Sequence, residues 1–162
     1  MKKLKLYLDT NIIGNLDEHG DPKSMSEAHA LWDMIKAGEF DVVISEVTLI
    51  EISDNKNLEK VDILYSYLSE IIFEHIHMND EIEHIAEIIK NSGLIVEDKQ
   101  LNDRRHIGGT LVSRADILVS ANYKHLVNVK TIMGVKKIAL VEGYGFVEIY
   151  PPSVIIDKGD KK

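Results

Sequence analysis

The amino-acid sequence predicts an α/β fold with a mainly parallel central sheet that helices cover on both faces. Short apolar segments rich in β-branched residues alternate with amphipathic helical patterns along the chain, and this alternation is typical of a parallel sheet. The length of 162 residues fits one compact domain with a buried core. Hydrophobic residues make up 44% and charged residues 28% of the chain, which favours a globular protein over a disordered one.

The first half of the chain begins with a strand and alternates from there. Residues 4–8 alternate leucine with Lys and Tyr, the pattern of a strand, and a loop with turn residues is expected over 17–23. Ser24 and Glu27 have the spacing of a capping box, and the helix that follows is expected to end at Gly38. The next expected elements are a strand over 40–44, a helix capped by Ser45 that runs to about residue 53, and a helix over 58–68.

The second half continues the alternation. Residues 71–78 are a strand candidate, and apolar side chains at helical spacing predict a helix over 82–92. A helix is also expected over 103–113, although Gly108 and Gly109 each cost about 1 kcal/mol relative to alanine. The last expected elements are a strand over 117–119, a helix over 131–141 and a strand over 146–150. We expect one domain over 1–156, followed by a polar tail over 157–162.

The composition excludes several classes of site. The chain has no cysteine, so disulfides, zinc–thiolate sites, iron–sulfur clusters and thiol catalysis are ruled out. No apolar segment approaches the roughly 20 residues that span a bilayer, and the N-terminal residues lack the core of a signal peptide. We therefore expect a soluble, cytoplasmic protein with no membrane partner.

Charge is distributed unevenly along the chain. The net charge of −8 argues against nucleic-acid binding over the whole surface, but residues 99–141 hold eight Lys and Arg side chains against two acidic ones. A basic segment on an acidic chain can guide a polyanion to one face of the molecule. An ordinary solvated surface would give the same pattern, so both interpretations stay open.

Acidic side chains stand at the boundaries of separate predicted elements. Asp9 directly follows the first strand, and Asp103 begins a helix. Asp116 precedes a buried strand and Asn122 follows it, while Glu51 lies in an otherwise apolar segment where burial is costly unless the charge is paired. Each position also has a purely structural interpretation as a cap, a turn or an exposed charge. Because ligands bind beyond the carboxyl ends of parallel strands, we expect several of these groups to converge.

Clustered carboxylates repel one another, and a hard divalent cation held by oxygen ligands removes the conflict. Mg²⁺ keeps several waters and leaves room for phosphate oxygens. A metal-bound water is then a better nucleophile, and the ion offsets charge at a scissile phosphate. The pattern therefore favours hydrolysis of phosphate esters without cysteine.

Four segments carry a resemblance to a known family: residues 8–13 (LDTNII), 45–52 (SEVTLIEI), 102–107 (NDRRHI) and 115–126 (ADILVSANYKHL). In this order and at this spacing, the sequence resembles the PIN-domain ribonuclease family, which includes the VapC-type toxins of toxin–antitoxin pairs. The likeness extends over about residues 4–156.

The resemblance implies a three-layer α/β/α fold and an endoribonuclease that depends on Mg²⁺ or Mn²⁺ and hydrolyses RNA phosphodiester bonds. It assigns the catalytic acids to Asp9, Glu51 and Asp103. Many members have a fourth acid after the last central strand, where this chain has Asn122, and nearby Asp116 is a candidate to compensate. The candidate metal ligands are therefore Asp9, Glu51, Asp103, Asp116 and Asn122.

Other residues of the matching segments are assigned supporting roles. Thr10 and Asn11 are expected to orient Asp9 or a water by hydrogen bonding, and Ser120 to support the fourth position. The candidates for contacting the RNA strand are Arg104, Arg105, Lys124 and His125, whose phosphate contacts would set affinity rather than sequence choice. The resemblance also implies an antitoxin protein and a second copy of this chain as partners.

The sequence leaves two other functions open. Asn122 at the place of an acid favours, as an alternative, a catalytically weak or inactive PIN-like module that binds RNA or protein. An unrelated α/β phosphohydrolase or receiver-like domain would also use an acidic pocket. His106 is expected to pack or hydrogen-bond beside the acidic site, because no HxxxH or HExxH spacing points to a transition-metal site.

Overall fold

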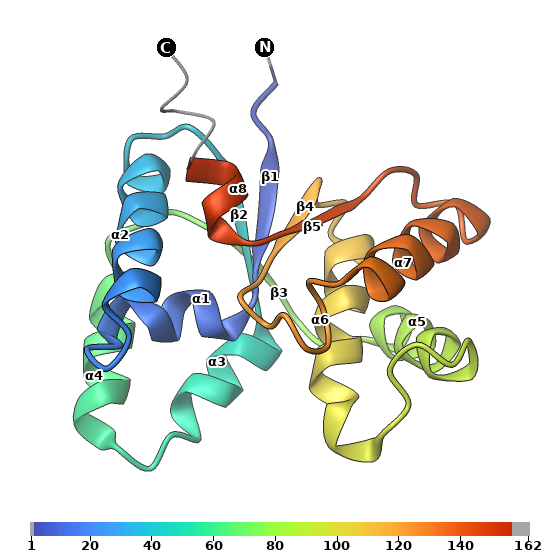
Figure 1. Ribbon diagram of the computed structural model, residues 1–162, viewed down its shortest axis with the longest axis horizontal. Helices are drawn as coiled ribbons and strands as arrows, with labels where there is room; N and C mark the ends of the chain where they lie inside the picture. The colour runs from blue at the N-terminus through green and yellow to red at the C-terminus, as the bar shows by residue number, and fades with distance from the viewer. Residues whose placement is uncertain (1, 157–162) are drawn as a thin grey trace.

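The computed structural model describes residues 2–156, which contain a five-stranded parallel sheet (Figure 1). The strands are β1 (Lys5–Leu8), β2 (Asp41–Ser45), β3 (Glu74–Ile76), β4 (Ile117–Val119) and β5 (Glu148–Tyr150), in the order β3-β2-β1-β4-β5. Every neighbouring pair is parallel, as the alternation of strands and helices predicts. The strand order changes direction at β1. The carboxyl ends of β1 and β4 therefore form the switch point where such sheets bind ligands.

Helices cover both faces of this sheet and complete the three α/β/α layers (Figure 1). One core is shared with α1 (Thr10–Gly14), α2 (Pro22–Lys36), α3 (Glu46–Ser53), α4 (Leu58–Leu68) and α8 (Pro152–Ile156). The other is shared with α5 (Asp80–Asn91), α6 (Leu101–Val112) and α7 (Val129–Val141). In β1, Leu6 and Leu8 point into the first core and Tyr7 into the second, because successive side chains of a strand face opposite sides. The predicted fold class is confirmed.

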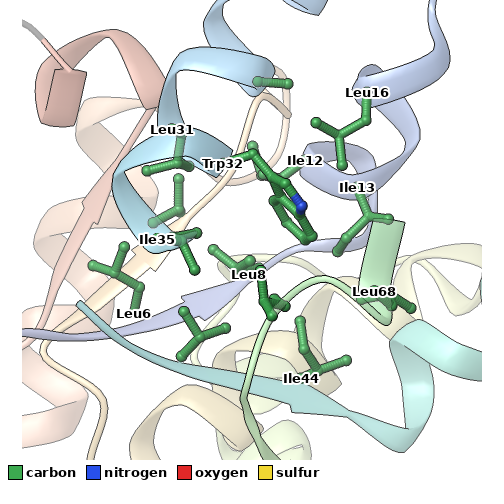
Figure 2. Packing of buried hydrophobic residues seen from close by; sticks show 14 of the residues in the cluster. Leu6, Leu8, Ile12, Ile13, Leu16, Leu31, Trp32, Ile35, Ile44 and Leu68 are labelled. Carbon is green, nitrogen blue, oxygen red and sulfur yellow. The ribbon is translucent and has the colours of Figure 1, made fainter. Parts of the chain in front are cut away.

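The first core is centred on Trp32 of α2. Figure 2 shows the indole ring between Leu8 of β1 and the α1 residues Ile12 and Ile13. All four side chains are almost completely buried. Because α1 begins directly after β1, this packing also fixes the direction in which the chain leaves the sheet.

The structure differs from the predicted boundaries at several places. Helix α2 begins at Pro22, and Asp21 is its N-cap, accepting a hydrogen bond from the Ser24 backbone N–H. Proline is preorganised for the first helical position, so the helix starts before the predicted capping box. The sequence does not predict α1 and α8, since five residues are too few to show a helical period. Strand β3 is shorter than residues 71–78, and the predicted tail over 157–162 lies outside the described residues. Within residues 2–156, no helix is long and apolar enough to cross a membrane.

Gly108 and Gly109 lie where α6 comes closest to its neighbours. A β-carbon at Gly108 would lie 2.9 Å from the backbone oxygen of Ile82 on α5. A β-carbon at Gly109 would lie 2.9 Å from the ring of Tyr7 in β1. Both distances are too short for a side chain, so the two glycines allow α6 to pack against the sheet and α5 at once.

We therefore expect Gly108→Ala to destabilise the protein by about 1–3 kcal/mol, the cost of overpacking. The substitution raises helix propensity by about 1 kcal/mol, but the Ile82 carbonyl belongs to the backbone of α5 and cannot rotate away. Urea unfolding measures the change. Gly14→Ala in α1 is the matched control, because no described heavy atom outside its own helix lies within 4 Å of the added carbon. Equal stability of the two variants would contradict this account of the packing.

Candidate functional site

A polar pocket of about 410 Å³ opens at the carboxyl ends of β1 and β4. Among the side chains that line it are four from separate parts of the chain: Asp9 after β1, Glu51 on α3, Asp103 on α6 and Asn122 after β4. We call this the acidic pocket. The structure therefore brings together the three predicted catalytic acids and the predicted fourth-position residue at the switch point of the sheet.

Asp9 is held rigidly at the end of β1. It is the N-cap of α1, and its Oδ1 accepts the Thr10 backbone N–H at 2.8 Å. Its Oδ2 accepts the Ser120 hydroxyl at 2.7 Å. Asp9 is only 5% exposed, but each carboxylate oxygen can accept a further partner. The carboxylate is thus fixed in place and still able to bind a cation.

Ser120 and Asn11 connect β4 to this corner. The Ser120 Oγ that donates to Asp9 also accepts the backbone N–H of Asn122 at 2.9 Å. The Asn11 Oδ1 accepts the Ala121 backbone N–H at 3.1 Å. These contacts join the start of α1 to the loop after β4.

Glu51 is oriented by two hydrogen bonds to the same oxygen. The Thr10 hydroxyl donates to Glu51 Oε1 at 2.6 Å, and His106 Nε2 lies 2.7 Å from that atom. Burial raises the pKa of Glu51, but the hydrogen bonds from His106 and Thr10 and the nearby histidine outweigh burial, so the pKa is lowered. Glu51 is therefore an ionised acceptor in the pocket.

The pKa of Asp103 is shifted in the opposite direction, upward. Burial raises its pKa, and the negative charges of Asp9 and Glu51 raise it further. Its Oδ1 lies 3.4 Å from the Asn122 side-chain N–H₂, while Asn122 Oδ1 accepts the His125 backbone N–H at 3.0 Å. Burial is the main cause of the raised pKa, and the neighbouring carboxylates add to it; a cation relieves this repulsion between carboxylates.

Within residues 2–156, no three His, Asp or Glu side chains are arranged so that all could hold one metal ion. Asp9 and Asp103 nevertheless share the acidic pocket and repel each other. Mg²⁺ is bound through one or two carboxylates and keeps several waters. These two residues therefore fit a hydrated divalent cation, whereas Glu51 is held through Oε1 by two donors of the protein, His106 and Thr10.

His106 lies completely buried beneath the pocket, as expected from its place beside the acids. Its Nδ1 is 2.8 Å from the Tyr7 hydroxyl, which donates to Ser45 Oγ at 2.8 Å. Its Nε2 is also 3.4 Å from Asp9 Oδ1. Burial alone would lower the pKa of His106, but Tyr7, Asp9 and Glu51 overcome that effect and hold the pKa well above its usual value.

Asp116 does not reach the acidic pocket. Its Oδ2 accepts the Lys5 backbone N–H at 2.7 Å, at the amino end of β1. Asp116 precedes β4 and Asn122 follows it, so the two residues lie at opposite ends of this strand. This position contradicts the proposal that Asp116 compensates for the missing fourth acid.

Two of the four residues predicted to contact RNA, Arg104 and Arg105, bind other groups of the protein instead. Arg104 is 3% exposed, and its guanidinium donates to the backbone oxygens of Ile95 and Glu97 at 2.9 Å each. It holds the loop before α6 and does not present its charge to RNA, which contradicts its predicted role. Arg105 binds both carboxylate oxygens of Glu83, at 2.7 and 3.1 Å, and lines a different pocket.

The other two candidates lie on the loop after β4. Lys124 is exposed to solvent. The ring of His125 lies 2.9 Å from the Gln100 side-chain nitrogen. They follow Asn122 by two and three positions, and neither is among the described residues that line the acidic pocket.

Lys60 is a pocket residue that the sequence analysis does not identify. It lies on α4 and lines the wall of the acidic pocket. Its Nζ is 3.7 Å from Glu18 Oε2 and donates to the Asp17 backbone oxygen at 3.3 Å. Nothing local in the sequence marks this lysine, because only the packing of α4 beside the segment after α1 brings it to the pocket.

Comparison with known proteins supports the fold. No family model and no curated protein sequence matches the chain. Among solved structures, the chain is similar to the crystal structure of VapBC2 from Rickettsia felis bound to a DNA fragment from their promoter, with a TM-score of 0.54. The match covers 90% of this chain and 98% of that chain at 18% sequence identity. The chain has a PIN-like fold.

The PIN-like fold accounts for the position of the acidic pocket. Its parallel sheet places the residues after β1 and β4 at one edge, and α3 and α6 add Glu51 and Asp103 from the flanking layers. A likeness at this level of identity establishes the architecture. The chemistry follows from the side chains in the pocket.

Proposed function

We propose that this protein is a metal-dependent endoribonuclease that hydrolyses RNA phosphodiester bonds, and that it acts as the toxin of a toxin–antitoxin pair. The observation that carries the proposal is the convergence of Asp9, Glu51 and Asp103, from three separate elements, on one pocket at the sheet's switch point. Side chains selected only for stability would not be gathered against their mutual repulsion.

Asp9 and Asp103 would hold Mg²⁺ or Mn²⁺, with waters completing the coordination. When bound, the ion would supply an activated water and offset the charge of the departing oxygen. Asp9 contributes a carboxylate that Thr10 and Ser120 hold in one orientation. Glu51 contributes an ionised acceptor beside the reacting phosphate, fixed by Thr10 and His106.

A cleavage assay on mixed single-stranded RNA tests the proposal. We expect cleavage in Mg²⁺ or Mn²⁺, loss of cleavage after chelation, and recovery when the ion is restored. Cleavage that persists in a chelator would overturn the proposed chemistry.

Lys60 is proposed to contact an RNA phosphate at the rim of the acidic pocket. We expect Lys60→Met to weaken RNA binding and to reduce the salt dependence of binding by about 0.7 in the logarithmic slope, the contribution of one phosphate contact on a single strand. Fluorescence anisotropy with labelled RNA in chelator measures binding without cleavage.

Lys90→Met is the matched control for this prediction. Lys90 lies on α5, and its Nζ is also 3.7 Å from one acidic oxygen, that of Asp98. Its loss should leave binding unchanged. If the two variants bind RNA equally well at every salt concentration, Lys60 does not contact the strand.

One observation favours a second candidate function, that of a PIN-like module that binds RNA or protein without cleaving. Asn122 supplies an amide where family members place an acid, and its N–H₂ group faces Asp103. The Mg²⁺-dependent assay separates the two: RNA binding with no cleavage at any divalent ion concentration would support this alternative.

The toxin assignment predicts an antitoxin partner. The similar structure is that of a VapBC2 complex on promoter DNA, and we propose that this chain is paired in the same way. Co-expression with the protein encoded beside it should give a complex in which RNA cleavage is suppressed. A neighbour that neither binds the chain nor lowers its activity would contradict the toxin assignment and leave the nuclease assignment standing.

A further inference from the structure

The acidic pocket contains one carboxylate that is already committed to protein partners. Glu51 Oε1 receives the Thr10 hydroxyl at 2.6 Å and lies 2.7 Å from His106 Nε2. An ionised carboxylate can only accept hydrogen bonds, so the proton of this contact is carried by His106 Nε2. Glu51 is therefore held by a donor from α6 and a donor from α1 at the same oxygen.

His106 is itself unable to move away. It is 1% exposed, and its Nδ1 contacts the Tyr7 hydroxyl at 2.8 Å. The two rings meet edge to face, with centroids 5.7 Å apart. Tyr7 is completely buried in β1 and is anchored to Ser45. The sheet thus fixes the histidine, and the histidine fixes Glu51.

The other two acids are placed differently. Asp9 accepts one backbone N–H and one hydroxyl, which are ordinary supports of a metal-binding carboxylate. His106 Nε2 lies 3.4 Å from Asp9 Oδ1 but only 2.7 Å from Glu51 Oε1, so its hydrogen bond goes to Glu51. Asp103 Oδ1 accepts a hydrogen bond from the Asn122 amide at 3.4 Å, which is a weak contact. Asn122 brings no negative charge to the place of a fourth acid. Glu18 also lines the pocket, but its Oε2 lies 3.7 Å from the Lys60 ammonium. The pocket therefore offers Asp9 and Asp103 for one ion and lacks the charge for a second.

We propose that His106 is a positioning residue that holds Glu51 away from the cation, so that the acidic pocket binds a single divalent ion through Asp9 and Asp103. The inference rests on the proposed function and adds the number of ions and the role of His106. Glu51 then acts as a fixed hydrogen-bond acceptor in the pocket rather than as a metal ligand.

Binding of Mn²⁺ alone to the RNA-free protein tests the number of ions. Electron paramagnetic resonance of free Mn²⁺ gives the stoichiometry, and thermal unfolding confirms that each variant is folded. We expect one ion per chain in the wild type, one in Glu51→Gln, and none at the same concentration in Asp103→Asn. Two ions per chain in the wild type, or loss of the ion in Glu51→Gln, would overturn the inference.

A pair of amide variants tests the role of His106. In His106→Gln the amide nitrogen reaches the place of Nε2 and can still donate to Glu51. In His106→Asn the shorter amide stays on the Tyr7 side, so Glu51 keeps the Thr10 hydroxyl and loses its donor from α6. We expect His106→Gln to bind Mn²⁺ as the wild type does. His106→Asn should bind it roughly tenfold more tightly, or bind a second ion, because the freed Glu51 adds a ligand charge.

The double variant His106→Asn/Glu51→Gln should return to the wild-type Mn²⁺ binding. A folded His106→Asn protein that binds Mn²⁺ as the wild type does would show that His106 does not keep Glu51 away from the ion. If His106→Asn does not fold, the wild-type stoichiometry and Glu51→Gln still decide whether the pocket binds one ion without Glu51, and loss of Mn²⁺ binding in a folded His106→Gln protein would contradict the role given to His106. Failure of the proposed function looks different: either the wild type binds no Mn²⁺, or Asp9→Asn binds it unchanged.

Discussion

Asp9→Asn is expected to abolish RNA cleavage while the protein stays folded. The substitution keeps the size of the side chain and an oxygen that can cap α1 at Thr10, but it removes a negative charge from the acidic pocket. Loss of an outer partner of a metal site already costs about 10- to 100-fold in activity, so we expect the loss of a ligand to exceed about 100-fold. Initial cleavage rates on labelled RNA in Mg²⁺ measure the effect.

Thermal unfolding of the same variant separates loss of function from loss of structure. Removing the Asp9 charge relieves its repulsion with Asp103 but also removes one of the charges that raise the His106 pKa, so the two effects oppose each other and the variant should stay folded with a small change in unfolding temperature. Asp33→Asn is the control, since this exposed acid lies on α2 beside Lys36 and outside the acidic pocket. Cleavage retained by a folded Asp9→Asn protein would place the active site elsewhere.

Trp32→Ala is expected to have the largest effect on stability, a loss of about 3–5 kcal/mol. The indole ring is 1% exposed and fills the space between α2, β1 and α1 (Figure 2). Removing it leaves a cavity that the surrounding Leu8, Ile12 and Ile13 can close only in part. Domains of this kind are stable by about 5–15 kcal/mol in total. The variant should therefore unfold at a much lower urea concentration.

Trp32→Phe is the matched comparison. The buried Trp32 indole N–H has no hydrogen-bond partner among the described residues. An unpaired buried donor costs about 1–3 kcal/mol, and phenylalanine removes that cost while keeping most of the apolar contact. We expect Trp32→Phe to lose less than half of what Trp32→Ala loses. Equal losses of stability in the two variants would show that an aromatic ring at this position does not account for the packing energy.

The same core connects stability to the acidic pocket. Ile12 and Ile13 belong to α1, and α1 begins at the cap formed by Asp9. A protein weakened at Trp32 should therefore hold Asp9 less rigidly, and its cleavage rate should fall before the sheet unfolds.

The local sequence was sufficient to predict much of this architecture. Alternation along 4–8, the cap at Ser45 and the apolar stripe of α5 depend on neighbours within one or two turns. The position of Asp9 directly after a strand also predicts a place at the carboxyl edge of the sheet, because a parallel sheet collects those ends. The gathering of Asp9, Glu51 and Asp103 in one pocket agrees with that reasoning.

Only the tertiary structure decided which side chains face the pocket and which are used elsewhere. Asp116 and Asn122 are close in sequence, yet they lie at opposite ends of the intervening strand. Arg104 and Arg105 are neighbours in α6, but one is buried against a loop and the other binds Glu83. These outcomes depend on contacts between distant parts of the chain.

The contact between His106 and Glu51 was likewise decided by the tertiary structure. The two residues are 55 positions apart, and their contact requires α3, α6 and β1 to pack together. Sequence patterns report the period and the boundaries of an element, because these depend on residues a few positions away. They do not report the partner of a buried polar group, because that partner is selected by the packing of whole elements. The sequence alone therefore determined the fold class and the candidate acids, and the tertiary structure determined their partners.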